Sequence, residues 1–159
     1  MKVISNSSPL IVLHNCGQLG LLRQLFGEVL IPEAVYQEVV HNTKNLRQSE
    51  AIAQCSFIQV HPIPPQLFSF SHKLDRGETE AIILAASLKA DYLLLDDKRA
   101  HKEAKSQGIT FIPTFAVLLK AAQKGIISDF EAVLTELQQK NIFLGRDLNL
   151  AAKDFLDLY

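Results

Sequence analysis

Asp91-Tyr-Leu-Leu-Leu-Asp-Asp97 is the stretch of the chain that says most about its fold. Three consecutive leucines after a tyrosine are typical of a strand that is buried on both faces, as in the middle of a parallel sheet. The strand ends in two adjacent carboxylates, and a basic segment with helical character follows from Lys98. In open α/β sheets, ligands bind beyond the carboxyl ends of the strands. The stretch therefore predicts two negative charges at the edge of the sheet where such folds hold their ligands.

Length and composition indicate one ordinary globular domain. The chain has 159 residues, of which 48% are hydrophobic and 21% are charged, and its formal net charge is −1. This balance argues against a generally basic nucleic-acid-binding protein but leaves a local basic patch open. Two cysteines without metal-ligand spacing predict reduced thiols, and no apolar run reaches the ~18–20 residues of a membrane span. We therefore expect a cytoplasmic single domain over residues 1–159, with 128–159 as a C-terminal helical extension.

Short apolar runs alternate with helical segments along the whole chain. Strands are expected at 3–4, 28–31, 57–60, 91–95 and 109–112. Helices are expected between them and after them, at 10–16, 19–26, 33–40, 46–54, 79–89, 98–107, 115–124, 128–140 and 148–159. This order is typical of a parallel sheet with helices on both faces. The predicted fold class is α/β, a three-layer α/β/α sandwich with a parallel, roughly five-stranded sheet.

Several helix starts are marked by capping residues. Ser8 followed by proline is a good helix start, and the polar turn before it is a place where phosphates can bind. Asp75 and Glu78 match the capping-box pattern, as do Ser128 and Glu131. A further cap is expected from Thr114. Between the third strand and the next helix, the proline-rich segment 61–71 is expected to form an irregular surface loop or lid.

Acidic and amide side chains recur near the predicted strand ends. The candidates are Asn6, Glu38, Glu80, Asp96 and Asp97. Glu80 stands out because apolar residues follow it in a helix that is apolar nearly all round. An isolated buried carboxylate costs several kcal/mol unless it is paired or bound to a metal ion. Carboxylates that gather in one place repel each other, so a divalent cation best explains their arrangement.

Each candidate also has a purely structural explanation. Glu38 could be a solvated charge on a helix, Asp97 the N-cap of the helix after it, and Asn6 a turn-former. Asp96 is harder to explain in this way, because one cap is enough for one helix. A basic face on the following helix is either solvated or binds phosphates; its residues are Lys98, Arg99, Lys102 and Lys105.

Four motifs taken together resemble the PIN domain, and in particular a branch of PIN-like prokaryotic proteins related to VapC-type toxins. The motifs are Ser5-Asn-Ser-Ser-Pro-Leu-Ile11, Ile31-Pro-Glu-Ala-Val-Tyr-Gln-Glu-Val39, Leu74-Asp-Arg-Gly-Glu-Thr-Glu-Ala-Ile82 and Leu93-Leu-Leu-Asp-Asp-Lys-Arg-Ala100. The last two are fairly specific together and weak apart. The resemblance covers most of the chain.

The resemblance implies an endoribonuclease that uses Mg²⁺ or Mn²⁺ to cleave single-stranded or structured RNA. Its catalytic carboxylates would be Glu38, Glu80, Asp96 and Asp97. Its metal ligands would be Asn6, Glu38, Glu80, Asp96 and Asp97. Its RNA contacts would come from Ser7, Lys98, Arg99 and Lys102. The implied setting is a cytoplasmic toxin with RNA as substrate and a small antitoxin protein as partner, and we also expect a homodimer.

Asn6 is the main departure, because PIN nucleases usually have aspartate at this position. An amide oxygen can still bind a cation, but the site loses one negative charge. The alternative function is therefore a catalytically weak or inactive PIN-like module that binds RNA or protein. A nucleotide-binding or receiver-like α/β domain is disfavoured, because its acidic pair would follow the first strand and no glycine-rich phosphate loop is present. A serine hydrolase is disfavoured because no nucleophile elbow occurs.

Overall fold

A five-stranded parallel sheet forms the centre of the molecule in the computed structural model, which describes residues 1–64, 70 and 73–158. Every neighbouring pair of strands is parallel. The strands are β1 (Val3–Ser5), β2 (Val29–Ile31), β3 (Ile58–Val60), β4 (Tyr92–Leu94) and β5 (Phe111–Ile112). Their order across the sheet is β3-β2-β1-β4-β5.

Helices occupy most of the connections between the strands. They are α1 (Ser7–Asn15), α2 (Leu21–Phe26), α3 (Glu33–Tyr36), the π-helix η1 (Gln37–His41), α4 (Leu46–Ala53), α5 (Arg76–Leu88), α6 (Lys98–Ser106), α7 (Thr114–Gln123), α8 (Phe130–Gln139) and α9 (Leu150–Asp157). Among the helices within the described ranges, none combines the length and apolarity needed to cross a bilayer.

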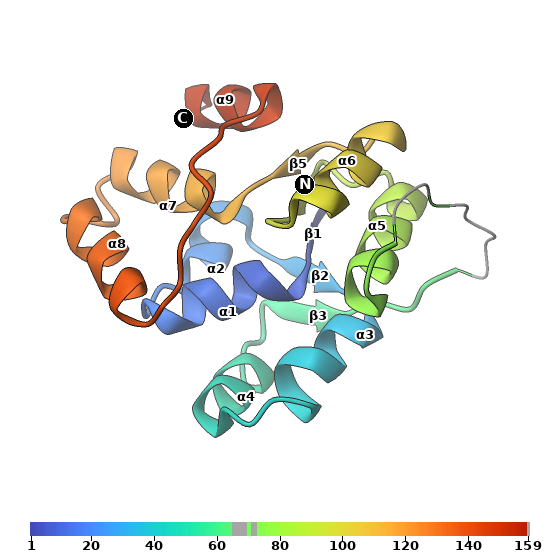
Figure 1. Ribbon diagram of the computed structural model, residues 1–159, viewed down its shortest axis with the longest axis horizontal. Coiled ribbons are helices and arrows are strands. Elements are labelled where there is room, and N and C mark those ends of the chain that lie inside the picture. The colour runs from blue at the N-terminus through green and yellow to red at the C-terminus, as the bar shows by residue number, and fades with distance from the viewer. Residues whose placement is uncertain (65–69, 71–72, 159) are drawn as a thin grey trace.

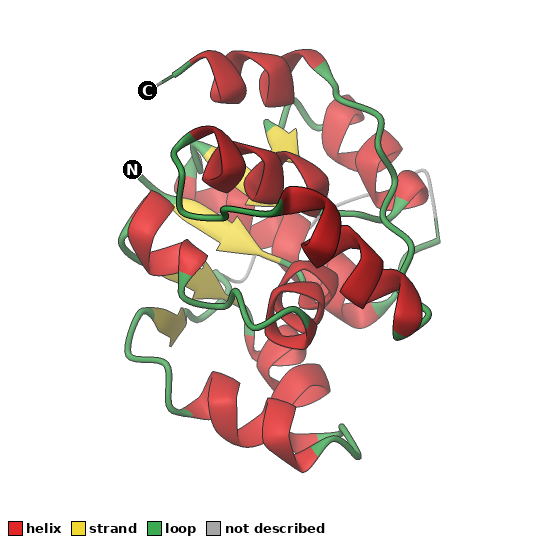
Figure 2. Ribbon diagram, turned by 90° about the vertical axis from the view of Figure 1, so that its left-hand side faces the viewer, coloured by secondary structure: helices red, strands yellow, loops and turns green. Residues whose placement is uncertain are grey.

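The sheet is buried on both faces, which makes the fold a three-layer α/β/α sandwich. Successive side chains of a strand point to opposite faces, so Val3 and Leu94 belong to one hydrophobic core and Ile4 and Leu93 to the other. The larger core includes residues of α1, α2 and α7, and the smaller one includes residues of α5 and α6. Figure 2 shows the strands enclosed between helices. The predicted fold class is therefore confirmed.

The order of the strands places a switch point between β1 and β4. From β1 the chain moves outward through β2 to β3, and then returns to the other side of β1 with β4 and β5. The first residue after β1 is tied to β4, because the Asn6 amide N–H donates to the Leu94 carbonyl oxygen at 3.0 Å. In such sheets the crevice at the switch point, beyond the carboxyl ends of the strands, is where ligands bind.

Strand positions agree with the sequence-based prediction better than helix starts do. The capping box of Asp75 and Glu78 is confirmed. The prediction for Thr114 was wrong, because Pro113 is the N-cap and Thr114 is the first residue of α7. The second predicted capping box was also wrong: Asp129 caps α8 by accepting from the Ala132 amide at 3.0 Å.

α8 and α9 both pack against α7, and α9 also packs against the sheet edge at β5. Figure 1 shows the segment that connects α8 to α9 running past α7 to this edge. Phe155 of α9 stacks on Phe26, and the buried Lys120 of α7 donates to the Leu156 carbonyl oxygen at 3.2 Å. Burial lowers the pKa of Lys120. The predicted helix end at Tyr159 and most of the predicted loop 61–71 lie outside the described residues.

Candidate functional site

The amino ends of several helices lie at the carboxyl edge of the sheet. α1 follows β1, α3 follows β2, α6 follows β4 and α7 follows β5, each after no more than three residues. Figure 1 shows α3 and α5 side by side at the end toward which β2 and β3 point. A helix amino terminus presents free N–H groups and a partial positive charge, so this edge stabilises negative side chains.

Asp96 is fixed by three hydrogen bonds at the switch point. Its Oδ1 accepts from the Thr114 amide at 2.8 Å, and its Oδ2 accepts from the Thr114 hydroxyl at 2.7 Å and from the Ser8 hydroxyl at 2.9 Å. Since Pro113 makes no side-chain cap, the Asp96 carboxylate serves as the cap of α7. Asp96 thus joins the helices that follow β1 and β5, and its carboxylate is held in one orientation.

Glu38 reaches the same edge from the π-helix that continues α3. Its Oε2 accepts from the Ser7 hydroxyl at 2.5 Å. Its other oxygen lies against the backbone of Gly77, where an added Cβ would be only 2.3 Å from Glu38 Oε1. The glycine therefore leaves the space that the carboxylate fills. π-Turns within helices are frequent at functional sites.

A Gly77→Ala variant tests whether this space matters. The new methyl group would displace the end of the Glu38 side chain, which is flexible, so the fold should survive. Alanine also favours a helix over glycine by about 0.5–1 kcal/mol. We expect a free energy of unfolding within about 1 kcal/mol of wild type, and a loss of any activity that depends on Glu38 of about 10²-fold.

Gly20→Ala is the matched control, because Gly20 has φ −62° and no atom within 4 Å of an added Cβ. Urea unfolding and an activity assay on both variants give the comparison. Equal activity of the two alanine variants would show that the placement of Glu38 has no functional role.

Glu80 has a clear structural partner. Its Oε1 accepts from the Ala34 amide at 3.0 Å, at the amino end of α3, and its Oε2 accepts from the Arg76 guanidinium at 2.9 Å. The N-cap of α3 is Pro32, which makes no side-chain cap, so Glu80 takes that role. Glu80 therefore docks α5 onto the helix that leads to Glu38.

Asp97 and Glu78 are two further acidic side chains, and they lie close enough for the charge of Asp97 to act on Glu78. Asp97 is exposed and caps α6, because its Oδ1 accepts from the amides of Arg99 and Ala100 at 2.9 and 3.0 Å. Glu78 is buried at the start of α5 and accepts from the Asp75 amide at 3.1 Å. Burial is the largest influence on the pKa of Glu78, and the charges of Asp75 and Asp97 add to it, so the pKa rises to about 6.

A Glu78→Gln variant should be more stable than wild type at neutral pH. The folded-state pKa of Glu78 is about 6 and the reference value is 4.5, so folding favours the neutral form. The contribution of Glu78 to stability is therefore most favourable below pH 4.5 and is lost as the pH rises through about 6. Glutamine stays neutral and still completes a capping box.

The variant and wild type differ in their free energy of unfolding. We expect this difference to be about 1–2 kcal/mol larger, in favour of the variant, at pH 7 than at pH 4.5. Urea unfolding in the presence of a chelator measures it at both pH values. An advantage that does not change with pH would contradict the buried, proton-binding role of Glu78.

Asn6 has a buried polar atom without a partner. The residue is 5% exposed, and its Oδ1 accepts no hydrogen bond from the described part of the chain. The next two residues in sequence, Ser7 and Ser8, donate to Glu38 and Asp96, so Asn6 directly precedes the two donors that hold these carboxylates. A buried acceptor that makes no hydrogen bond is costly and requires an explanation.

The structure brings together some of the predicted metal ligands and separates others. Asn6, Glu38 and Asp96 are linked through Ser7 and Ser8. Glu80 is directed to the amino end of α3 and Asp97 to that of α6. Across residues 1–64, 70 and 73–158, no three His, Cys, Asp or Glu side chains are grouped as a metal ion would require. Each of the four carboxylates is instead bound to N–H or O–H donors of the protein.

The predicted RNA contacts differ in exposure. Lys98, Arg99 and Lys102 are exposed on α6. Ser7 is buried, and its hydroxyl donates to Glu38. The three basic residues are therefore accessible to a polyanion, whereas Ser7 is placed to orient a carboxylate.

The sequence matches the family model described as PIN domain (DUF3368) over residues 2–155. The chain belongs to the PIN-domain family. A solved structure with the same fold is a PilT N-terminus domain protein from the hyperthermophilic archaeon Sulfolobus solfataricus. That protein is 18% identical, with a TM-score of 0.53, and the match covers 76% of this chain and 93% of that one. A search of curated proteins found no match.

PIN domains have a nuclease-like fold and generally use divalent metal ions, and the residues of this PIN domain fit such an ion chemically. Hard divalent cations prefer oxygen ligands, and the buried Asn6 Oδ1 is an oxygen that accepts from no donor among the described residues. Glu38 and Asp96 offer carboxylate oxygens, which are held by Ser7 and Ser8, the next two residues of the chain.

Residues that hold the carboxylates of this PIN domain were missed or misassigned from sequence. They are Ser8, Gly77 and Thr114. Ser8 and Thr114 were interpreted only as helix caps. The capping role of Glu78 was predicted correctly, but its burial and raised pKa were not predicted. Gly77 was part of a recognised motif, but its contact with Glu38 joins two distant segments, which no local pattern predicts.

Proposed function

We propose that this PIN domain is an endoribonuclease that depends on Mg²⁺ or Mn²⁺. The observation that supports this most is the buried Asn6 Oδ1, which has no hydrogen-bond partner among the described residues and directly precedes the donors to Glu38 and Asp96, Ser7 and Ser8. These groups lie at the switch point of a parallel sheet, where α/β folds bind ligands. The PIN-domain assignment favours phosphodiester hydrolysis over other chemistry at this edge.

Asn6, Glu38 and Asp96 would hold the ion, with Glu80 and Asp97 as predicted further ligands. A bound divalent ion would supply charge neutralisation for the phosphate and lower the pKa of a water molecule. The protein's own part is to orient the ligands. Ser8 and Thr114 fix the Asp96 carboxylate, and Ser7 fixes that of Glu38.

The exposed cations of α6 would bind the RNA backbone. Lys98 and Lys102 are one helical turn apart, and Arg99 lies next to them. Phosphate contacts of this kind give sequence-independent affinity that falls with salt concentration. They would place a phosphodiester beside Asp96, which is two residues before Lys98 in sequence.

Cleavage of a labelled single-stranded RNA tests the proposal. We expect cleavage in Mn²⁺ or Mg²⁺ and none in a chelator, with activity restored when the ion is added back. Cleavage that persists in the chelator would argue against a metal-dependent reaction. RNA that stays intact over a full titration of both ions would argue against a nuclease.

A second function is favoured specifically by Asn6. An amide in place of a carboxylate removes one negative charge from the proposed ion site, so the protein could bind RNA or a protein partner without cleaving it. RNA binding that is insensitive to Mn²⁺, measured by fluorescence anisotropy, together with the absence of cleavage, would support this function over the first.

A toxin–antitoxin role and a homodimer remain part of the proposal. Expression of a toxin alone would arrest cell growth. Co-expression of a small partner protein encoded next to it would restore growth. The dimer is tested by light scattering on the purified chain. A monomer at micromolar concentration would contradict the expected homodimer without bearing on the cleavage chemistry.

A further inference from the structure

A cavity of about 410 Å³ lies directly beside Asp96. One side of it is formed by α6, and the other by the segment between α8 and α9. The residues that matter for its chemistry are Asp96, Lys98, His101, Lys102, Phe111 and Asp147. Its volume is within the ~300–1,000 Å³ of pockets that bind small molecules. Asp96 belongs both to this cavity and to the candidate metal site, so the two are adjacent.

Two stacked rings form an aromatic wall of the cavity. The His101 and Phe111 rings are 4.4 Å apart at an interplanar angle of 16°. His101 is fixed in this position because its Nε2 donates to the Leu95 carbonyl oxygen. Each ring covers one face of the other, so only an outer face of the pair is open to a base. Aromatic faces are the usual surfaces on which the bases of single-stranded nucleic acids stack.

The charges around the cavity are of both signs. Lys98 and Lys102 are exposed on α6, and neither makes a salt bridge with any residue that the structure describes. Asp147, from the opposite segment, is exposed and offers only acceptor oxygens. Two cations, an aromatic wall and an exposed acceptor match the phosphate, the ring and the amino group of one nucleotide.

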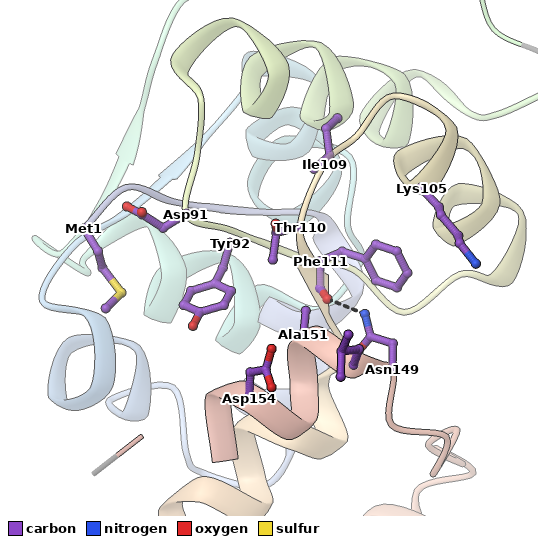
Figure 3. Close-up of a pocket in the computed structure, with 11 residues that line it drawn as sticks. Met1, Asp91, Tyr92, Lys105, Ile109, Thr110, Phe111, Asn149, Ala151 and Asp154 are labelled. Atoms are coloured by element: carbon purple, nitrogen blue, oxygen red, sulfur yellow. Dashed lines mark hydrogen bonds between the residues drawn. The ribbon is translucent and has the colours of Figure 1, made fainter. Parts of the chain in front are cut away.

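A larger cavity, about 780 Å³, lies at the other end of the same sheet edge (Figure 3). Phe111 and Asn149 line both cavities. The two residues separate one cavity from the other, and the Asn149 side-chain amide donates to the Phe111 carbonyl oxygen at 2.8 Å. The larger cavity is lined by Met1, Asp91 and Asp154, and it does not include Asp96. It opens at the amino ends of β4 and β5, away from the candidate metal site.

We propose that the smaller cavity binds the nucleotide next to the scissile phosphate. Its base stacks on the His101–Phe111 wall, its phosphate is bound by Lys98 and Lys102, and Asp147 accepts from an exocyclic amino group. The site therefore prefers a base with an amino group over uracil, since carboxylates accept from such groups. The role in cleavage rests on the proposed nuclease function, whereas nucleotide binding does not require it.

NMR titration of the full chain in a chelator tests the site without any cleavage. The probes are cytidine 5′-monophosphate and uridine 5′-monophosphate, which have similar shapes and differ in the amino group. We expect the amides around His101 and Asp147 to shift, and cytidine monophosphate to bind about fivefold more tightly. Asp147→Asn should remove this difference.

Lys102→Ala should lower the affinity for both nucleotides by about threefold to fivefold, because a phosphate contact is lost. Lys105→Ala is the matched control, since Lys105 lies on the same helix but lines the larger cavity. Equal effects of the two lysine variants, equal affinity for the two nucleotides, or shifts that map elsewhere would overturn the proposed site.

The two proposals fail in different ways. If the protein binds nucleotides at this site but never cleaves RNA, the proposed nucleotide site is supported and the proposed nuclease function is contradicted. If the protein cleaves RNA in a metal-dependent way but its His101 and Asp147 amides do not shift with either nucleotide, the nuclease function is supported and the proposed nucleotide site is contradicted.

Discussion

An Asp96→Asn variant is expected to lose metal-dependent RNA cleavage by at least about 10²-fold. Asp96 is the carboxylate that the sheet places at the switch point, and it accepts from Ser8 and twice from Thr114. Asparagine keeps one acceptor oxygen for the Thr114 amide but removes the negative charge. The loss of charge weakens the binding of a divalent cation, which prefers carboxylate oxygens.

Stability should change much less than activity in this variant. The Ser8 and Thr114 hydroxyls can rotate to accept from the new amide group, since a hydroxyl both donates and accepts. We expect the free energy of unfolding to fall by about 1 kcal/mol, the size of one weakened charged hydrogen bond. Urea unfolding and single-turnover cleavage in Mn²⁺ measure the two effects separately.

Asp91→Asn is the matched control, because Asp91 precedes the same strand at its other end. It is exposed and accepts from the Lys2 amide at 2.7 Å. The variant makes the same chemical change and should cleave like wild type. Comparable cleavage by both variants would mean that Asp96 acts only as the cap of α7.

The fold was predictable because its signals are local. The leucines of β4 and the apolar runs of the other strands identify the sheet, and the helices between them require parallel pairing. Capping by Asp75 and Glu78 was predictable for the same reason, since the two residues are three apart in sequence. The start of α3 at Glu33 matches the prediction, but the groups that cap α3 and α7 were not predicted, because Glu80 and Asp96 supply them from other elements.

The candidate site was predictable only in part, because its contacts are long-range. Asp96 was identified from its place at a strand end. Its partners Ser8 and Thr114 are 88 and 18 residues away in sequence, and Glu80 and Ala34 are separated by 46. A charged residue in an apolar helix indicated that Glu80 needed a partner. The identity of that partner depends on how α5 packs against α3, which the sequence pattern does not specify.

Helix amino termini explain how the acidic groups can lie at one edge of the sheet. Asp96, Glu80 and Asp97 each accept from a backbone amide in the first turn of a helix. Such contacts favour a carboxylate by about 0.3–1 kcal/mol each. Glu38 accepts instead from the hydroxyl of Ser7, the first residue of α1. The protein therefore offsets part of the mutual repulsion by itself, and a bound ion would need to offset only the remainder.

An Asn6→Asp variant should gain both metal affinity and cleavage. Asn6 is 5% exposed, its Oδ1 has no partner in the part of the chain that the structure describes, and the next two residues bind Glu38 and Asp96. A third carboxylate would strengthen the attraction for a divalent cation, so we expect cleavage in Mn²⁺ to rise by about tenfold. Without the ion, the new charge is buried near other carboxylates and should cost about 1–3 kcal/mol of stability.

The opposite signs of these effects make the test specific. Urea unfolding in a chelator should show the variant to be less stable than wild type, and Mn²⁺ should restore most of the difference. Asn45→Asp is the matched control, because Asn45 caps α4 by accepting from the Gln48 amide at 3.1 Å and aspartate caps a helix equally well. That control should be insensitive to Mn²⁺. If Asn6→Asp were equally insensitive, the oxygen at this position would not face an ion, and the catalytically inactive, binding function would be favoured instead.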